Sequence, residues 1–250
     1  VRAVGPSAAD NGVVSVDPYM QPSSLPPPPA PPSDNQRKEL ETRRLRLSQL
    51  EAAKGSQFID RIVVSTDDEE IAQVAQESGA EVPFMRPPEL AQDDSDHFAV
   101  VEHAIHWLGE DEVYPDYIML LQPTSPLRTA GDINAAIQIA KERDAAAVVS
   151  VCVTKHHPYL SKRVLKDGTL ADFVSDDVGD LSRQLLPPAY ALNGSIYLNS
   201  RESLLSDRTF RPPGAYAYIM PPERSLDIDT PWDFHLAGLI LKDKGDRRSA

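Results

Sequence analysis

Apolar runs of strand length alternate with segments of helical period through the middle of the chain. The run DRIVVST (60–66) is typical of a buried strand, and DDEEIAQVAQESGA (67–80) is typical of the helix that follows it. The same alternation continues in HFAVVEHAIHWL, YIMLLQ, AGDINAAIQIAKER and AAAVVSVCV, which predict a helix, a strand, a helix and a strand. This succession predicts an α/β fold with a mostly parallel sheet and helices on both faces.

The pattern changes outside this region. Residues 1–36 are dense in proline and serine, as in a disordered tail, so one α/β domain is expected over 37–250. Between residues 154 and 213, prolines, glycines and short strand-like pieces such as GSIYLN indicate a dimerisation or substrate subdomain. The regular pattern returns with the strand AYAYIM and a terminal helix, for which Thr230 fits the cap and Pro231 the first helical position.

Charge and cysteine content narrow the classes of protein. The chain carries 38 acidic and 25 basic side chains, a formal net charge of -13, which disfavours nonspecific binding to nucleic-acid phosphates. The single cysteine, Cys152, cannot form an intrachain disulfide and suits a reducing compartment. No apolar run approaches the roughly 18 residues of a membrane span. We therefore expect a cytoplasmic protein with neither nucleic-acid nor membrane partners.

Polar residues follow the predicted strands at their carboxyl ends, where ligands collect in parallel sheets. In the loop LLQPTSPLR, two prolines stiffen the backbone and present Gln122, Thr124 and Ser125 as hydrogen-bonding groups. Such a set suits a polyhydroxylated ligand. A proline-rigid turn in which Thr124 or Ser125 caps a helix explains the same residues equally well.

The stretch RSLDIDT holds two carboxylates one residue apart, Asp227 and Asp229. In an extended chain they project to one face, roughly 6.5 to 7 Å apart. Their hard oxygens suit one Mg2+ ion whose remaining positions go to water and phosphate. Alternatively, Asp229 only adds negative charge at the N-terminus of the helix that Thr230 caps. The residues alone leave both interpretations open.

Seven stretches, in this order, resemble the cytidylyltransferases that activate sialic acid and related nonulosonic acids. They are FIDRIVVSTDDEEIA, RPPELAQDDS, LLQPTSPLRT, VVSVCVTKHHP, RQLLPPAYALNGSIYLN, YIM and RSLDIDT. The resemblance covers residues from about 50 to the C-terminus. It implies a Rossmann-like (GT-A-like) nucleotidyltransferase fold, a homodimer, and Mg2+-dependent transfer of CMP from CTP to a sugar acid with release of pyrophosphate.

The resemblance also implies roles for individual residues. Asp227 and Asp229 match the family's catalytic, metal-binding aspartates, while Arg86 and Ser95 match the part that meets the nucleotide base. The expected contacts to the sugar acid are Gln122, Thr124, Ser125, Lys162, Arg183, Asn193 and Tyr197. These motifs suit several sugar acids and do not select one.

The chain departs from the family before Leu50. Family members begin with a buried strand and a glycine-rich basic loop of the type A-R-x-G-S-K-G, which cradles the triphosphate. No such loop precedes Leu50 here, so residues 1 to about 48 are expected to replace the first strand and the phosphate loop. Two functions follow: an active cytidylyltransferase, or a catalytically impaired member that keeps a sugar-acid-binding, nucleotide-binding or dimerising surface.

Overall fold

The computed structural model describes residues 48–92, 94–110, 114–174 and 183–248 of the 250-residue chain. The predicted tail and almost all of the predicted N-terminal replacement lie outside these ranges. Within them, no helix is long and apolar enough to cross a membrane.

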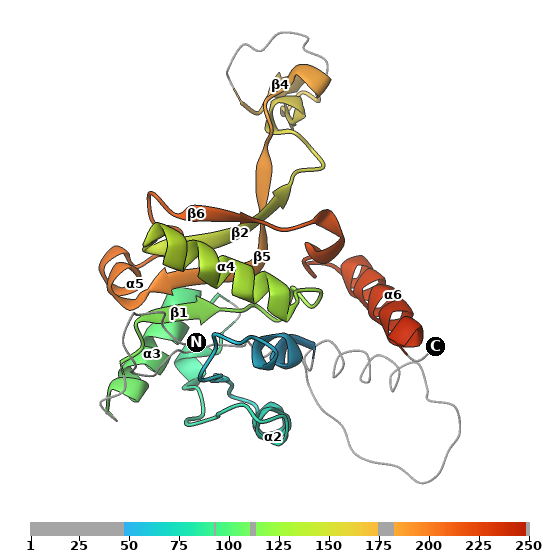
Figure 1. The fold of residues 1–250 in the computed structure, drawn as a ribbon. Helices are drawn as coiled ribbons and strands as arrows, with labels where there is room; N and C mark the ends of the chain where they lie inside the picture. Colours follow the sequence, from blue (N-terminus) through green and yellow to red (C-terminus); the bar gives the residue numbers. More distant parts are fainter. Residues whose placement is uncertain (1–47, 93, 111–113, 175–182, 249–250) are drawn as a thin grey trace.

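A four-stranded mixed sheet forms the centre of the fold (Figure 1). Its strands are β1 (Tyr117–Leu120), β5 (Tyr190–Ser200), β2 (Ala147–Val153) and β6 (Tyr216–Ile219), in that spatial order. β5 pairs antiparallel with β1 and β2, and β2 pairs parallel with β6. The predicted α/β fold is confirmed, and three of the four strands run in one direction. The sheet is nevertheless mixed, because β5 enters between β1 and β2 and runs against both.

Helices cover both faces of the sheet, as predicted. One face packs against α4 (Ala130–Arg143) and the helix at 48–54, and the other against α3 (His97–Glu110) and α5 (Arg201–Asp207). Neighbouring residues of β1 divide between the two cores: Met119 joins the first and Ile118 the second. This division follows from the alternation of side chains along a strand.

The predicted strand at 60–66 is only partly formed. Val63 makes a single parallel bridge to Glu81, just after α2 (Glu69–Glu77). The backbone N–H of Val64 donates to Glu81 O at 2.8 Å, and that of Glu81 donates to Ile62 O at 2.7 Å. The segment is buried as expected, but its pairing is with the chain after α2 and not with the four-stranded sheet.

Two parts of the chain project from this body (Figure 1). One is the hairpin of β3 (Lys162–Val164) and β4 (Leu170–Asp172), and the other is the terminal helix α6 (Pro231–Arg248). β5 and α5 fall within the predicted 154–213 subdomain but belong to the central layers. Short 3-10 helices complete the fold at Pro88–Leu90, Pro158–Leu160, Arg183–Leu185 and Pro222–Arg224.

Candidate functional site

The structure brings the segment after β6 against the loop after β1. The backbone N–H of Ile228 donates to Thr124 O at 2.8 Å. Ser125 Oγ lies 3.5 Å from Asp227 Oδ1 across 102 positions of sequence, and the Thr124 side chain hydrogen-bonds this carboxylate. Two stretches that the sequence singled out separately thus form one site.

The Asp227 carboxylate is half-buried, and its charge is only partly compensated. Burial raises the pKa of Asp227, the hydrogen bond from Thr124 lowers it, and the nearby Asp229 raises it again. The net result is a raised pKa, because a carboxylate removed from water and set beside another is less stable as an anion. A bound cation would relieve this cost.

The donor set fits Mg2+, which prefers hard oxygen ligands and keeps several waters. Asp227 and Asp229 lie one residue apart in the same segment, with Asp229 exposed. The described residues hold no cluster of three or more His, Cys, Asp or Glu side chains. The remaining ligands of an ion here would therefore be water and substrate phosphate.

The start of α6 is capped without the Asp229 carboxylate. Asp233 Oδ2 accepts from the backbone N–H of Thr230 at 2.9 Å and from that of Asp229 at 3.3 Å. In return, Thr230 Oγ1 accepts from the backbone N–H of Asp233 at 3.3 Å. The cap predicted at Thr230 is present, and this reciprocal pair leaves the Asp229 carboxylate exposed beside Asp227.

The backbone of Gly194 lies close to three side chains of the site. An added Cβ would lie 2.6 Å from Asp227 Oδ2, 3.0 Å from Gln122 Oε1 and 3.1 Å from Ser125 Oγ. The φ angle of Gly194 is 67°, in the left-handed region that favours glycine. Three predicted site residues therefore converge over one backbone position. Gly194 is not among the predicted site residues, although a glycine inside a strand is a signal of close backbone approach.

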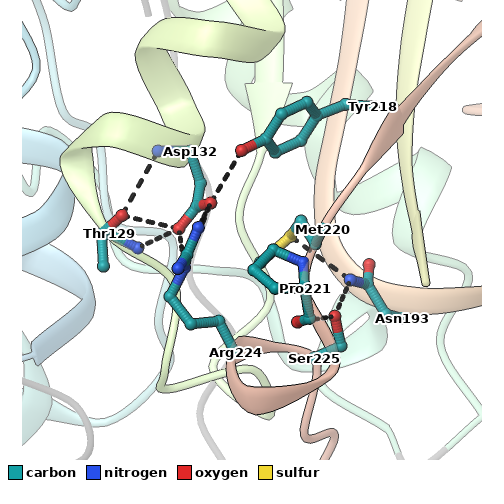
Figure 2. A network of polar contacts seen from close by, with 8 residues as sticks. All are labelled: Thr129, Asp132, Asn193, Tyr218, Met220, Pro221, Arg224 and Ser225. Atoms are coloured by element: carbon teal, nitrogen blue, oxygen red, sulfur yellow. Dashed lines mark hydrogen bonds and ion pairs between the residues drawn. The ribbon is translucent and has the colours of Figure 1, made fainter. Parts of the chain in front are cut away.

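Asn193, the residue before Gly194, hydrogen-bonds to several parts of the site. Its side chain is buried, and Oδ1 accepts from Ser150 Oγ at 2.6 Å. Figure 2 shows the bond that Nδ2 donates to Ser225 Oγ at 3.0 Å. The backbone O of Asn193 accepts from Ser125 Oγ at 3.1 Å. These bonds tie β5 to both site segments, while the predicted contact of Asn193 with a sugar acid stays a prediction.

Tyr197 lies on the other face of β5. Its ring packs 6.0 Å, centroid to centroid, from Phe210. Burial raises the pKa of the Tyr197 hydroxyl, Arg211 lowers it, and Asp227 raises it. The effect of Asp227 indicates that this hydroxyl lies within electrostatic range of the site.

A buried arginine that the sequence analysis missed lies beneath the loop. Arg128 Nη2 donates to Gln49 Oε1 at 3.1 Å and to Gln122 O at 3.4 Å, and Nη1 donates to Ser195 O. Burial lowers the pKa of Arg128 to about 9, although Asp227 acts to raise it. The guanidinium therefore remains charged at neutral pH. The sequence feature that could have indicated its burial is the apolar Leu127 directly before it.

The remaining predicted residues lie in two other places. Arg86 is buried beside the end of the 60–66 segment, where Nη2 donates to Asp67 Oδ1 at 3.1 Å, and Ser95 Oγ accepts from the backbone N–H of Gln92 at 2.8 Å in a turn. Lys162 is exposed in β3 and pairs with Asp172. Arg183 begins the 3-10 helix at 183–185. None of the described contacts joins these four residues to Asp227.

Comparison with known proteins shows the family of the chain. A family profile described as cytidylyltransferase matches residues 40–233, more than half of the chain. The chain belongs to the cytidylyltransferase family. It is 35% identical over 197 residues to the N-acylneuraminate cytidylyltransferase of Streptococcus agalactiae serotype V, covering 78% of this chain and 46% of that protein.

A second relative and a solved structure were also compared with the chain. The CMP-N,N'-diacetyllegionaminic acid synthase of Legionella pneumophila is 33% identical over 193 residues, 76% of this chain and 82% of that protein. The structure of CMP:2-keto-3-deoxy-manno-octonic acid synthetase complexed with CTP matches with a TM-score of 0.59 at 13% identity, covering 94% of this chain and 100% of that chain. At that identity, the likeness shows the nucleotidyltransferase fold alone. The chain spans about half the length of the Streptococcus protein.

Proposed function

We propose that this protein transfers CMP from CTP to a sialic acid or related nonulosonic acid, with release of pyrophosphate. The observation that carries the proposal is the juxtaposition of Asp227, Thr124 and Ser125, with the exposed Asp229 beside them. The acceptor class is supported by relatives whose names specify N-acylneuraminate and diacetyllegionaminic acid.

In the proposed reaction, the anomeric hydroxyl of the sugar acid attacks the α-phosphorus of CTP. The new bond joins that oxygen to phosphorus, the bond from the α-phosphorus to the oxygen that bridges to the β-phosphate breaks, pyrophosphate leaves with the electron pair, and the proton of the hydroxyl passes to solvent. Asp227 and Asp229 would hold Mg2+, which when bound supplies positive charge at the phosphates. Thr124 and Ser125 fix the Asp227 carboxylate, since positioning and charge neutralisation supply most of such catalysis.

The proposed reaction is tested by measuring pyrophosphate release from CTP by the purified chain with N-acetylneuraminic acid and Mg2+. We expect release that depends on both the acceptor and the metal and that falls to background in EDTA. Omitting the sugar acid controls for plain CTP hydrolysis. Binding of CTP with Mg2+ but no release would contradict the transferase and favour the second function below.

The second function is binding without turnover. It corresponds to the catalytically impaired family member that the sequence leaves open beside the active enzyme. The site around Asp227 would then still bind a nucleotide or a sugar acid.

We further propose that the projecting hairpin makes this protein a homodimer. The hairpin exposes large apolar side chains: Val164 is 73% exposed, Leu170 67% and Phe173 61%. Two strands alone are marginally stable in water, so such a hairpin gains from being covered. A second copy of the chain would supply an equivalent apolar surface.

The dimer prediction is tested by replacing Val164 and Leu170 together by aspartate. We expect the mass measured by light scattering after size-exclusion chromatography to fall from dimer to monomer. Leu239→Asp is the matched control, because Leu239 is 52% exposed on α6, away from the hairpin. A monomeric wild type, or a double variant that stays dimeric, would reject this interface.

A further inference from the structure

A single buried carboxylate, Asp132, joins the two segments that build the site (Figure 2). It lies at the third position of α4, which begins directly after the loop that carries Thr124 and Ser125. Asp132 Oδ2 accepts from the backbone N–H of Thr129 at 2.9 Å and from Thr129 Oγ1 at 2.6 Å. These bonds fix the end of the loop to the start of the helix.

The same carboxylate receives a two-pronged contact from the other segment. Arg224 Nη2 donates to Asp132 Oδ1 at 2.7 Å, and Arg224 Nε donates to Asp132 Oδ2 at 2.9 Å. Tyr218 Oη donates to Oδ1 at 2.8 Å. Burial raises the pKa of Asp132, but hydrogen bonds from Arg224, Thr129 and Tyr218 outweigh it and hold the pKa below its usual value. The ion pair is therefore intact at neutral pH.

Arg224 lies three residues before Asp227, in a short segment held at two further points. Ser225 Oγ accepts from Asn193 Nδ2 at 3.0 Å and donates to Pro221 O at 2.9 Å. The backbone N–H of Ile228 donates to Thr124 O at 2.8 Å. Arg224 thus holds the start of the segment, and Ile228 holds its end, on either side of the carboxylate.

We propose that Arg224 is a positioning residue whose bidentate pair with Asp132 sets the place of Asp227 relative to Thr124 and Ser125. The effect of this ion pair on metal and nucleotide binding rests on the proposed function, whereas its effect on the position of the segment around Asp227 does not. Arginine suits the task because its planar fork engages both carboxylate oxygens at once and fixes orientation. Lysine would keep the charge but lose the second contact.

The test compares Arg224→Lys with Arg208→Lys. Arg208 is a matched control, since it also pairs with both oxygens of a carboxylate, Glu102, at 2.8 and 3.3 Å, and no described contact joins it to the site. The first readout is amide hydrogen exchange of the ligand-free protein. In Arg224→Lys we expect the Ile228 amide to exchange roughly tenfold faster, with the amides of β2 unchanged, because the loss is local.

The second readout is the Mg2+ concentration needed for half-maximal CTP binding. We expect it to rise roughly tenfold in Arg224→Lys, as when a support of a metal ligand is removed, while CTP binding in EDTA stays unchanged. A purely structural role would weaken both kinds of binding or neither. Arg208→Lys should leave both readouts at wild-type values.

The outcomes separate the positioning role from the proposed function. If the wild type shows no Mg2+-dependent CTP binding, the proposed function fails, and exchange at Ile228 alone decides the role of Arg224. Unchanged Ile228 exchange in Arg224→Lys overturns the proposal, as does an equal rise across β2. If Arg224→Lys does not fold, Tyr218→Phe provides the milder loss of one Asp132 donor and should give a smaller increase confined to the same amide.

Discussion

Replacing Asp227 by asparagine is expected to make the ligand-free protein more stable and to lower its Mg2+-dependent affinity for CTP by about a hundredfold. The stability gain follows from the raised pKa of Asp227, whose charged form is disfavoured by burial and by Asp229. Neutral asparagine removes that cost while keeping nearly the same shape. We expect the melting temperature at pH 7 to rise by about 2 °C.

The pH dependence gives the sign of this effect. Because the folded-state pKa of Asp227 is raised, the protonated carboxyl favours folding below the ordinary pKa of 3.8, and this contribution is lost as pH rises through the folded-state pKa. The difference in melting temperature between variant and wild type should therefore be largest near neutral pH and vanish in acid. Asp207→Asn is a suitable control, because Asp207 is exposed at the end of α5.

Calorimetric titration of CTP with Mg2+ and with EDTA measures the second half of the prediction. A more stable variant whose Mg2+-dependent binding equals that of the wild type would reject the metal role and keep the electrostatic argument. A less stable variant at pH 7 would contradict the electrostatic argument itself.

Local patterns predicted those parts of the site that are close to strand ends. The loop with Thr124 and Ser125 follows a strand whose four residues form a clear apolar run, and the Asp227 segment follows another. Because both strands run in the same direction, their ends meet at one edge, as the rule for such sheets requires. That these residues lie close together could therefore be predicted from the sequence.

The residues that hold the site in place could not be predicted from the sequence, because each depends on a partner far away in sequence. Arg128 is buried against Ser195, 67 positions on, and Asp132 pairs with Arg224 across 92 positions. In a local sequence pattern, a charged side chain is interpreted as exposed to solvent. Only the tertiary structure supplies the partners that allow its burial. GSIYLN was predicted as strand-like, but its antiparallel place between β1 and β2 was not, because that pairing also depends on partners far away in sequence.

Gly194→Ala is expected to damage the site more than any other single methyl group added at a described glycine. At φ 67° an alanine costs roughly 1 to 2 kcal/mol of backbone strain, and its Cβ would lie 2.6 Å from Asp227 Oδ2. The carboxylate must move, so we expect the melting temperature to fall by roughly 5 °C and Mg2+-dependent CTP binding to fall with it. Thermal unfolding and calorimetric titration measure the two effects.

Gly214→Ala separates backbone strain from the steric clash. Gly214 has φ 83°, yet an added Cβ would meet nothing within 4 Å. It should therefore show the backbone cost and keep CTP binding. The clash is isolated further in the background of Asp227→Ala, where Gly194→Ala should destabilise less because the nearest oxygen is gone. Equal losses at Gly194 and Gly214, or no relief in the Asp227→Ala background, would mean that the carboxylate is not held over Gly194.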